Sequence, residues 1–152
     1  MKKSCLILAL FAIVLVFTGP STRAQGGAKQ GPDVIRDPDM EKDSLHNLEV
    51  ARQYFKLRKA YKASLARCEE IIAGNPTFSK IDEVLFIAGE SSLRLSENKG
   101  KQAVKTATDK LREDARDYLS QLVDSYPNSK FKDEALESLK SLGGPKPKES
   151  KP

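Results

Sequence analysis

Two stretches decide the fold: residues 71–85, IIAGNPTFSKIDEVL, and residues 122–136, LVDSYPNSKFKDEAL. In each stretch an apolar pair lies four and five residues before a proline, and an acidic pair begins six residues after it. A proline just beyond a helix and an acidic pair in a first turn are typical of the boundary between two helices. The repeated pattern therefore predicts stacked helical hairpins that bury their apolar faces on one another.

The periodicity of the apolar residues predicts an all-α fold with about five helices. Apolar residues recur at three- and four-residue spacing, and no run alternates β-branched residues as a strand would. Neither glycine nor proline separates the first two helices, so the repeat alone divides them. The helices are expected at residues 45–58, at 60–73, from just after Ser79 to a break at 98–100, at 102–125 and at 131–142. The expected N-caps are Asp43 or Ser44 for the first helix, Ser79 for the third and Ser129 for the fifth.

The start of the chain has the features of a secretory signal peptide. Lys2 and Lys3 precede an apolar run over residues 6–17, and small residues at Thr22 and Ala24 form a cleavage site. The apolar run is shorter than the roughly 20 residues that a stable membrane span needs. We therefore predict a signal peptide over residues 1–24, no transmembrane segment after its cleavage, and a bacterial periplasmic location.

The remaining chain divides by composition into three parts. Residues 25–43 are rich in glycine, proline and charge and predict a flexible leader. Residues 143–152 predict a disordered basic tail. Residues 44–142 lie between them and are expected to form one helical domain with a modest core.

The charge of the chain does not indicate a nucleic-acid partner. The formal net charge is +5, but removal of the predicted signal peptide leaves 23 basic against 21 acidic residues. Aromatic residues are few and are not interleaved with the basic ones in a strand pattern. The high isoelectric point is therefore no argument for nucleic-acid binding.

The two cysteines have different expected roles. Cys5 precedes the apolar run, so it does not lie where a lipoprotein signal carries its acylated cysteine. Cys68 alone remains after cleavage, so no intramolecular disulfide is expected. Its helical apolar neighbours indicate a small buried hydrophobe. The alternatives are an intermolecular bridge or a reactive thiol.

The sequence contains no convincing catalytic, cofactor or metal motif. His46 is the only histidine, and no cysteine, serine or acidic motif accompanies it. No paired metal-ligand spacing occurs, and the double glycines fall in segments predicted to be disordered. The acidic pairs at 82–83 and 133–134 are explained by the helix dipole. We therefore predict a protein that is not an enzyme.

The helix pairs resemble tetratricopeptide repeats, whose period is about 34 residues and whose second helix ends near a proline. Leu48, Ala51 and Phe55 fit the packing face of the first helix of such a repeat. Gly89 fits the small position where two helices approach closely. The excess length between the two copies falls at about residues 97–110 and lengthens the second hairpin. The resemblance implies a short solenoid of antiparallel hairpins.

Residues 126–131 and 133–136 resemble an element of the BamD family, tetratricopeptide lipoproteins of the machinery that inserts β-barrels into the bacterial outer membrane. The same element is similar to one in the CpoB family, where residues 86–90 match the run after the proline element. The resemblance covers residues 45–139 and implies a non-catalytic adaptor for envelope proteins, with peripheral outer-membrane association. A soluble CpoB-like regulator of the envelope and cell division, or a generic repeat module, is the alternative. The chain departs from the BamD pattern by lacking a cysteine after the apolar run and by showing two repeats and a fraction.

The resemblance also nominates residues for partner binding. In these repeats the inner faces of the first helices line a concave groove, and the outward residues of those helices contact the partner. A groove that mixes charge with an aromatic ring would hold an extended or helical peptide. The alternative for each residue is an ordinary solvated surface position. The nominated residues are Glu49, Gln53, Lys56, Phe86, Glu90 and Arg94.

Overall fold

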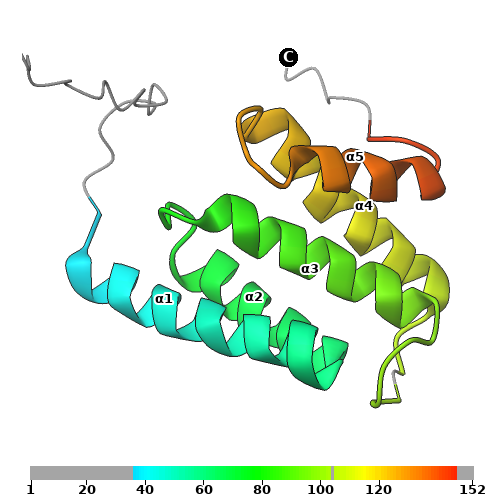
Figure 1. Cartoon of the computed structure of the whole chain (residues 1–152), viewed down its shortest axis with the longest axis horizontal. Coiled ribbons are helices and arrows are strands. Elements are labelled where there is room, and N and C mark those ends of the chain that lie inside the picture. The colour runs from blue at the N-terminus through cyan, green and yellow to red at the C-terminus, as the bar shows by residue number, and fades with distance from the viewer. Residues whose placement is uncertain (1–35, 104, 147–152) are drawn as a thin grey trace, which may run out of the picture.

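The computed structural model describes residues 36–103 and 105–146, and it contains no strand within those ranges. Figure 1 shows α1 and α2 as one hairpin, α3 and α4 as a second, and α5 packed on α4. The predicted all-α fold of stacked hairpins is thus confirmed. Its helices are α1 (Pro38–Gln53), the π-helical turn η1 (Tyr54–Arg58), α2 (Tyr61–Gly74), α3 (Ile81–Ser96), α4 (Thr108–Ser125) and α5 (Lys132–Ser141).

The centre of the fold is α3, which lies between α2 and α4 (Figure 1). Every residue from Val84 to Leu93 is buried. Gly89 allows α4 to come close, since a Cβ built on it would lie 2.6 Å from Cγ of Leu119 and 3.3 Å from the carbonyl oxygen of Ala115. The main core gathers around α3 from every helix. Its largest fully buried members are Leu48, Cys68, Val84, Leu85, Leu119, Leu122 and Leu139.

The first helix begins earlier than predicted. It starts at Pro38, and the side chain of Asp37 caps it by accepting hydrogen bonds from the backbone N–H groups of Asp39 (2.9 Å) and Met40 (3.4 Å). The prediction of an N-cap at Asp43 or Ser44 was wrong. The composition of residues 25–43 predicts a flexible leader, but within that range an aspartate at the N-cap and a proline at the first helical position favour a helix start.

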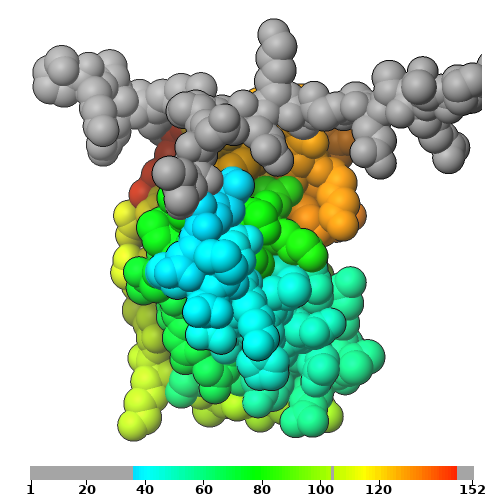
Figure 2. All heavy atoms as spheres, turned by 90° about the vertical axis from the view of Figure 1, so that its left-hand side faces the viewer, coloured from blue at the N-terminus to red at the C-terminus, as the bar shows by residue number. Residues whose placement is uncertain are grey.

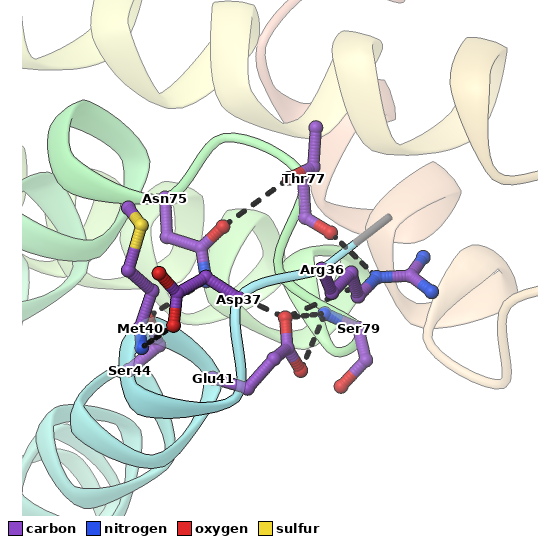
Figure 3. Close-up of polar contacts among 8 residues, drawn as sticks. All are labelled: Arg36, Asp37, Met40, Glu41, Ser44, Asn75, Thr77 and Ser79. Atoms are coloured by element: carbon purple, nitrogen blue, oxygen red, sulfur yellow. Dashed lines mark hydrogen bonds and ion pairs between the residues drawn. The ribbon is translucent and has the colours of Figure 1, made fainter. Parts of the chain in front are cut away.

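The start of α1 is tied to the turn between α2 and α3 by a polar cluster (Figure 3). The Glu41 carboxylate accepts hydrogen bonds from the backbone N–H of Ser79 (3.1 Å) and from Nδ2 of Asn75 (3.4 Å). Nδ2 of Asn75 also donates to Oγ of Ser44 at 3.1 Å. Ser79 is therefore not the N-cap of α3. That position belongs to Lys80, whose side chain makes no capping bond.

The junction between the first two helices lies where the repeat placed it. The helix widens into the π-helical turn η1, and Lys59 then adopts a left-handed conformation with φ of 51°. The backbone N–H of Ala60 donates to the carbonyl oxygen of Tyr54 at 2.9 Å and closes the turn. The left-handed residue ends the helix without glycine or proline, which explains why the local sequence carries no stop signal.

The later boundaries also differ from the predicted ones. Helix α4 begins at Thr108 rather than near residue 102. Phe131, not Ser129, occupies the N-cap position of α5. The Ser129 hydroxyl instead donates to Oδ2 of Asp82 at 2.6 Å and accepts from the backbone N–H of Phe131 at 3.2 Å. Serine in a turn offers such side-chain bonds as readily as it caps a helix.

The beginning of the predicted disordered tail is held against α4. Nε of Arg116 donates to the carbonyl oxygen of Gly144 at 2.7 Å, and the backbone N–H of Lys146 donates to Oγ of Ser120 at 2.9 Å. These bonds connect Gly144 and Lys146 to α4. The predicted signal peptide at 1–24, the leader up to residue 35 and the tail from residue 147 lie outside the described residues.

The close contact at Gly89 leads to a stability prediction. Gly89→Ala should lower the free energy of unfolding by about 1–3 kcal/mol, because overpacking against Leu119 outweighs the better helix propensity of alanine. The matched control is Gly74→Ala, where a Cβ would meet nothing within 4 Å. Urea unfolding followed by circular dichroism checks both variants. Equal unfolding midpoints for both variants would contradict the close α3–α4 approach.

Candidate partner-binding surface

The six nominated residues fall into two groups. Glu49 and Gln53 on α1 and Lys56 on η1 are exposed, as the resemblance implied. The three nominated residues on α3 are not outward-facing. Phe86 and Glu90 are only 8% and 7% exposed, and Arg94 is partly buried.

Phe86 and Glu90 join α3 to the segment that carries α5. The Phe86 ring stacks on the ring of Phe131, with centroids 4.9 Å apart and planes 17° apart. The Glu90 carboxylate accepts a hydrogen bond from Oγ of Ser138 on α5 and another from Nη2 of Arg94 at 3.2 Å. The segment that carries α5 therefore follows the two hairpins as the next element of the stack. It contacts the part of α3, at Phe86 and Glu90, that was expected to meet a partner.

Arg94 holds α3 to the junction of the first hairpin. Its guanidinium carbon lies 5.6 Å from the ring centroid of Phe55 and 5.7 Å from that of Tyr61. The two rings also pack edge to face, with centroids 5.5 Å apart. A cation over an aromatic face is stabilised by the ring quadrupole. Arg94 thus serves the packing of the hairpins, and the exposed nominated residues all lie on α1 and η1.

A bidentate ion pair between the two hairpins was not predicted. Arg52 on α1 donates two hydrogen bonds to the Glu83 carboxylate on α3, from Nε at 2.6 Å and from Nη2 at 2.7 Å. Glu83 belongs to an acidic pair that the helix dipole alone seemed to explain. Its role could have been found only by knowing that α1 and α3 lie side by side, because no local pattern pairs residues so far apart.

The environment of Glu83 alters its titration. Burial alone would raise the pKa of the Glu83 carboxyl, but the hydrogen bonds and charge of Arg52, with the charges of Lys130 and Lys80, outweigh burial and hold that pKa below its usual range. The hydrogen bond to Glu83 raises the pKa of Arg52 in turn. Both side chains are therefore charged at neutral pH.

Cys68 and His46 differ in burial, and neither belongs to a metal-binding group among the described residues. Cys68 is fully buried, and burial raises the pKa of its thiol far above the usual value, so the thiol stays protonated. This agrees with the interpretation of Cys68 as a small buried hydrophobe. His46 is exposed on α1. Within residues 36–146, apart from residue 104, no group of histidine, cysteine and acidic side chains could hold a metal ion.

Among the described residues, no helix is long and apolar enough to cross a bilayer.

The Arg52–Glu83 pair predicts a specific dependence of stability on pH. Because folding lowers the pKa of Glu83, the pair stabilises the fold above the unfolded value, about 4.3, and this stabilisation is lost as the pH falls through the folded-state pKa. Glu83→Gln should lower the free energy of unfolding by about 2 kcal/mol at pH 7 and flatten its change below about pH 5. The measurement is urea unfolding across pH 3–7.

The control for this experiment is Glu70→Gln. Glu70 pairs with Arg67 at 2.6 Å on the exposed side of α2, and an exposed pair contributes less than about 1 kcal/mol. An equal loss of stability in both variants, or an unchanged pH profile for Glu83→Gln, would contradict the importance of the contact between α1 and α3.

Comparison with protein families identifies a match over most of the chain. The profile of the YfiO family, described as "Outer membrane lipoprotein", matches residues 38–143, which include every described helix. No curated protein and no solved structure matches the chain. The YfiO family is the same family that residues 126–131 and 133–136 resemble, the BamD family. The chain therefore belongs to the YfiO outer membrane lipoprotein family, the tetratricopeptide-like family of BamD.

Proposed function

We propose that this protein is an exported, non-catalytic adaptor that binds other proteins of the bacterial envelope, and that it acts in the assembly of outer-membrane β-barrel proteins. The observation that carries the proposal is the family match, which spans the whole helical domain. The signal-like start of the sequence supports a periplasmic location reached by export. Stacked hairpins of this kind act by presenting surface to partners rather than by catalysis.

The partner surface in this proposal is the exposed side of α1. Glu49 and Gln53 lie one helical turn apart, so their side chains project from the same face. Polar side chains there can bond to the backbone or side chains of a bound peptide. The covering of α3 by α5 supports α1, rather than α3, as the helix that meets the partner.

A soluble periplasmic regulator of the CpoB type is the second candidate, and the cysteines favour it. Lipid attachment requires a cysteine directly after the apolar run of the signal, and the only cysteine beyond Cys5 is Cys68. Cys68 is buried in the core. In this alternative the protein has no lipid anchor and contacts the cell-division or cell-wall machinery.

Crosslinking in the native host, followed by affinity purification and mass spectrometry, tests the two candidates. The adaptor function predicts enrichment of the subunits that insert outer-membrane β-barrels. Enrichment of cell-wall synthesis or cell-division proteins without those subunits would favour the second candidate. Recovery of neither group would contradict both.

A variant pair then tests the partner surface. We expect Glu49→Lys combined with Gln53→Lys to lower the crosslinked yield at least about tenfold, because like charges and lost hydrogen bonds at an interface cost several kcal/mol. The control combines Gln121→Lys on α4 with Glu137→Lys on α5, which makes the same charge change at exposed positions. Equal yields from the two double variants would show that α1 does not meet the partner.

A further inference from the structure

The basic residues of this chain are segregated from the acidic ones. Residues 50–68 contain six basic residues and residues 98–108 contain three, and neither stretch contains an acidic residue. From residue 25 onward, the rest of the chain carries 14 basic against 21 acidic residues. A total charge close to balance therefore conceals a strongly basic part and an acidic remainder.

The two basic stretches meet at one end of the molecule. A Cβ built on Gly100 would lie 3.0 Å from the carbonyl oxygen of Lys59 and 2.9 Å from Cδ2 of Tyr61. The backbone N–H of Ala63 donates to Oε1 of Gln102 at 3.3 Å. Figure 2 shows teal atoms of the first stretch beside yellow-green atoms of the second along the lower end of the molecule. We refer to residues 56–62 and 99–101 together as the basic end.

Most cations of the basic end have no counter-ion. Lys99 pairs with Glu97 at 2.8 Å. The other five are exposed, and none of them forms an ion pair with any described residue. Clustered cations repel one another, and a partner that supplies negative charge would relieve this repulsion on binding. These five are Lys56, Arg58, Lys59, Lys62 and Lys101.

A leucine projects from the middle of these cations. Leu57 is 80% exposed, far more than the next large apolar side chains, Met40 at 44% and Leu45 at 40%. It lies in the π-helical turn η1, between Lys56 and Arg58. The widened turn and the left-handed residue after it place Leu57 outside the core, which is why an apolar side chain stands in water at a basic surface.

We propose that the basic end docks on a membrane surface of anionic phospholipid. The cations would meet the lipid phosphates, and the Leu57 side chain would enter the boundary between headgroups and acyl chains. An acidic protein segment would match the charge but would need an apolar site at the centre of its acidic groups. A bilayer presents anionic headgroups with an apolar layer directly beneath them at every point of its surface. The combination of exposed cations and one projecting leucine therefore favours a bilayer over an acidic protein segment.

Vesicle co-sedimentation of the full gene product, purified after export, tests this proposal. We expect binding to phosphatidylcholine vesicles that contain about one third phosphatidylglycerol, and at least tenfold weaker binding to phosphatidylcholine alone. Raising the salt concentration should release the protein, because exposed charges are screened. Lys62→Gln combined with Lys101→Gln, and separately Leu57→Ala, should each weaken binding about tenfold.

The control is Lys42→Gln combined with Lys140→Gln, which removes the same charge from exposed positions on α1 and α5 away from the basic end. Unchanged binding by this control supports the proposal. Equal binding to both kinds of vesicle, or equal weakening by the two lysine double variants, overturns it. Binding to polyglutamate without binding to anionic vesicles also overturns it and identifies an acidic polypeptide as the occupant. None of these substitutions touches Glu49 or Gln53, so the outcome is independent of the adaptor function.

Discussion

The burial of α3 between α2 and α4 is the constraint on which the rest of the structure depends. The distance between two packed helices depends on the side chains at their contact, and a small residue there lets them come closer. Gly89 meets Leu119, and the neighbouring Ser91 and Ser92 are fully buried. This close packing sets the positions of α2 and α4 relative to α3, and the polar contacts described above form within that arrangement.

Those polar contacts connect the first helices of successive hairpins. Arg52 and Glu83 join α1 to α3, and Glu90 and Ser138 join α3 to α5. Directional bonds of this kind select the register of helices whose apolar contacts alone would tolerate sliding. They also consume the side chains that a partner would otherwise meet on α3. In the functions proposed above, recognition therefore uses the exposed side of α1, and the basic end is a second, separate surface.

The sequence predicted the paired helices correctly, but it did not predict the contacts between the pairs. Pro76 and Pro127 marked the ends of α2 and α4 because proline forbids continuation of a helix. The start of α1 was missed because Pro38 signals a loop or a first helical turn equally well. Phe86 and Glu90 were nominated for a groove through the resemblance to tetratricopeptide repeats. Their burial follows from the position of α5, which no spacing along the chain reveals.

Native-state hydrogen exchange tests the central claim most directly. If α3 is the helix on which the fold depends, its amides from Val84 to Leu93 should exchange slowest, with opening free energies equal to that of global unfolding. The amides of α1 and α5 should exchange faster, through opening of the outer helices. Faster exchange in α3 than in both α1 and α5 would contradict the account.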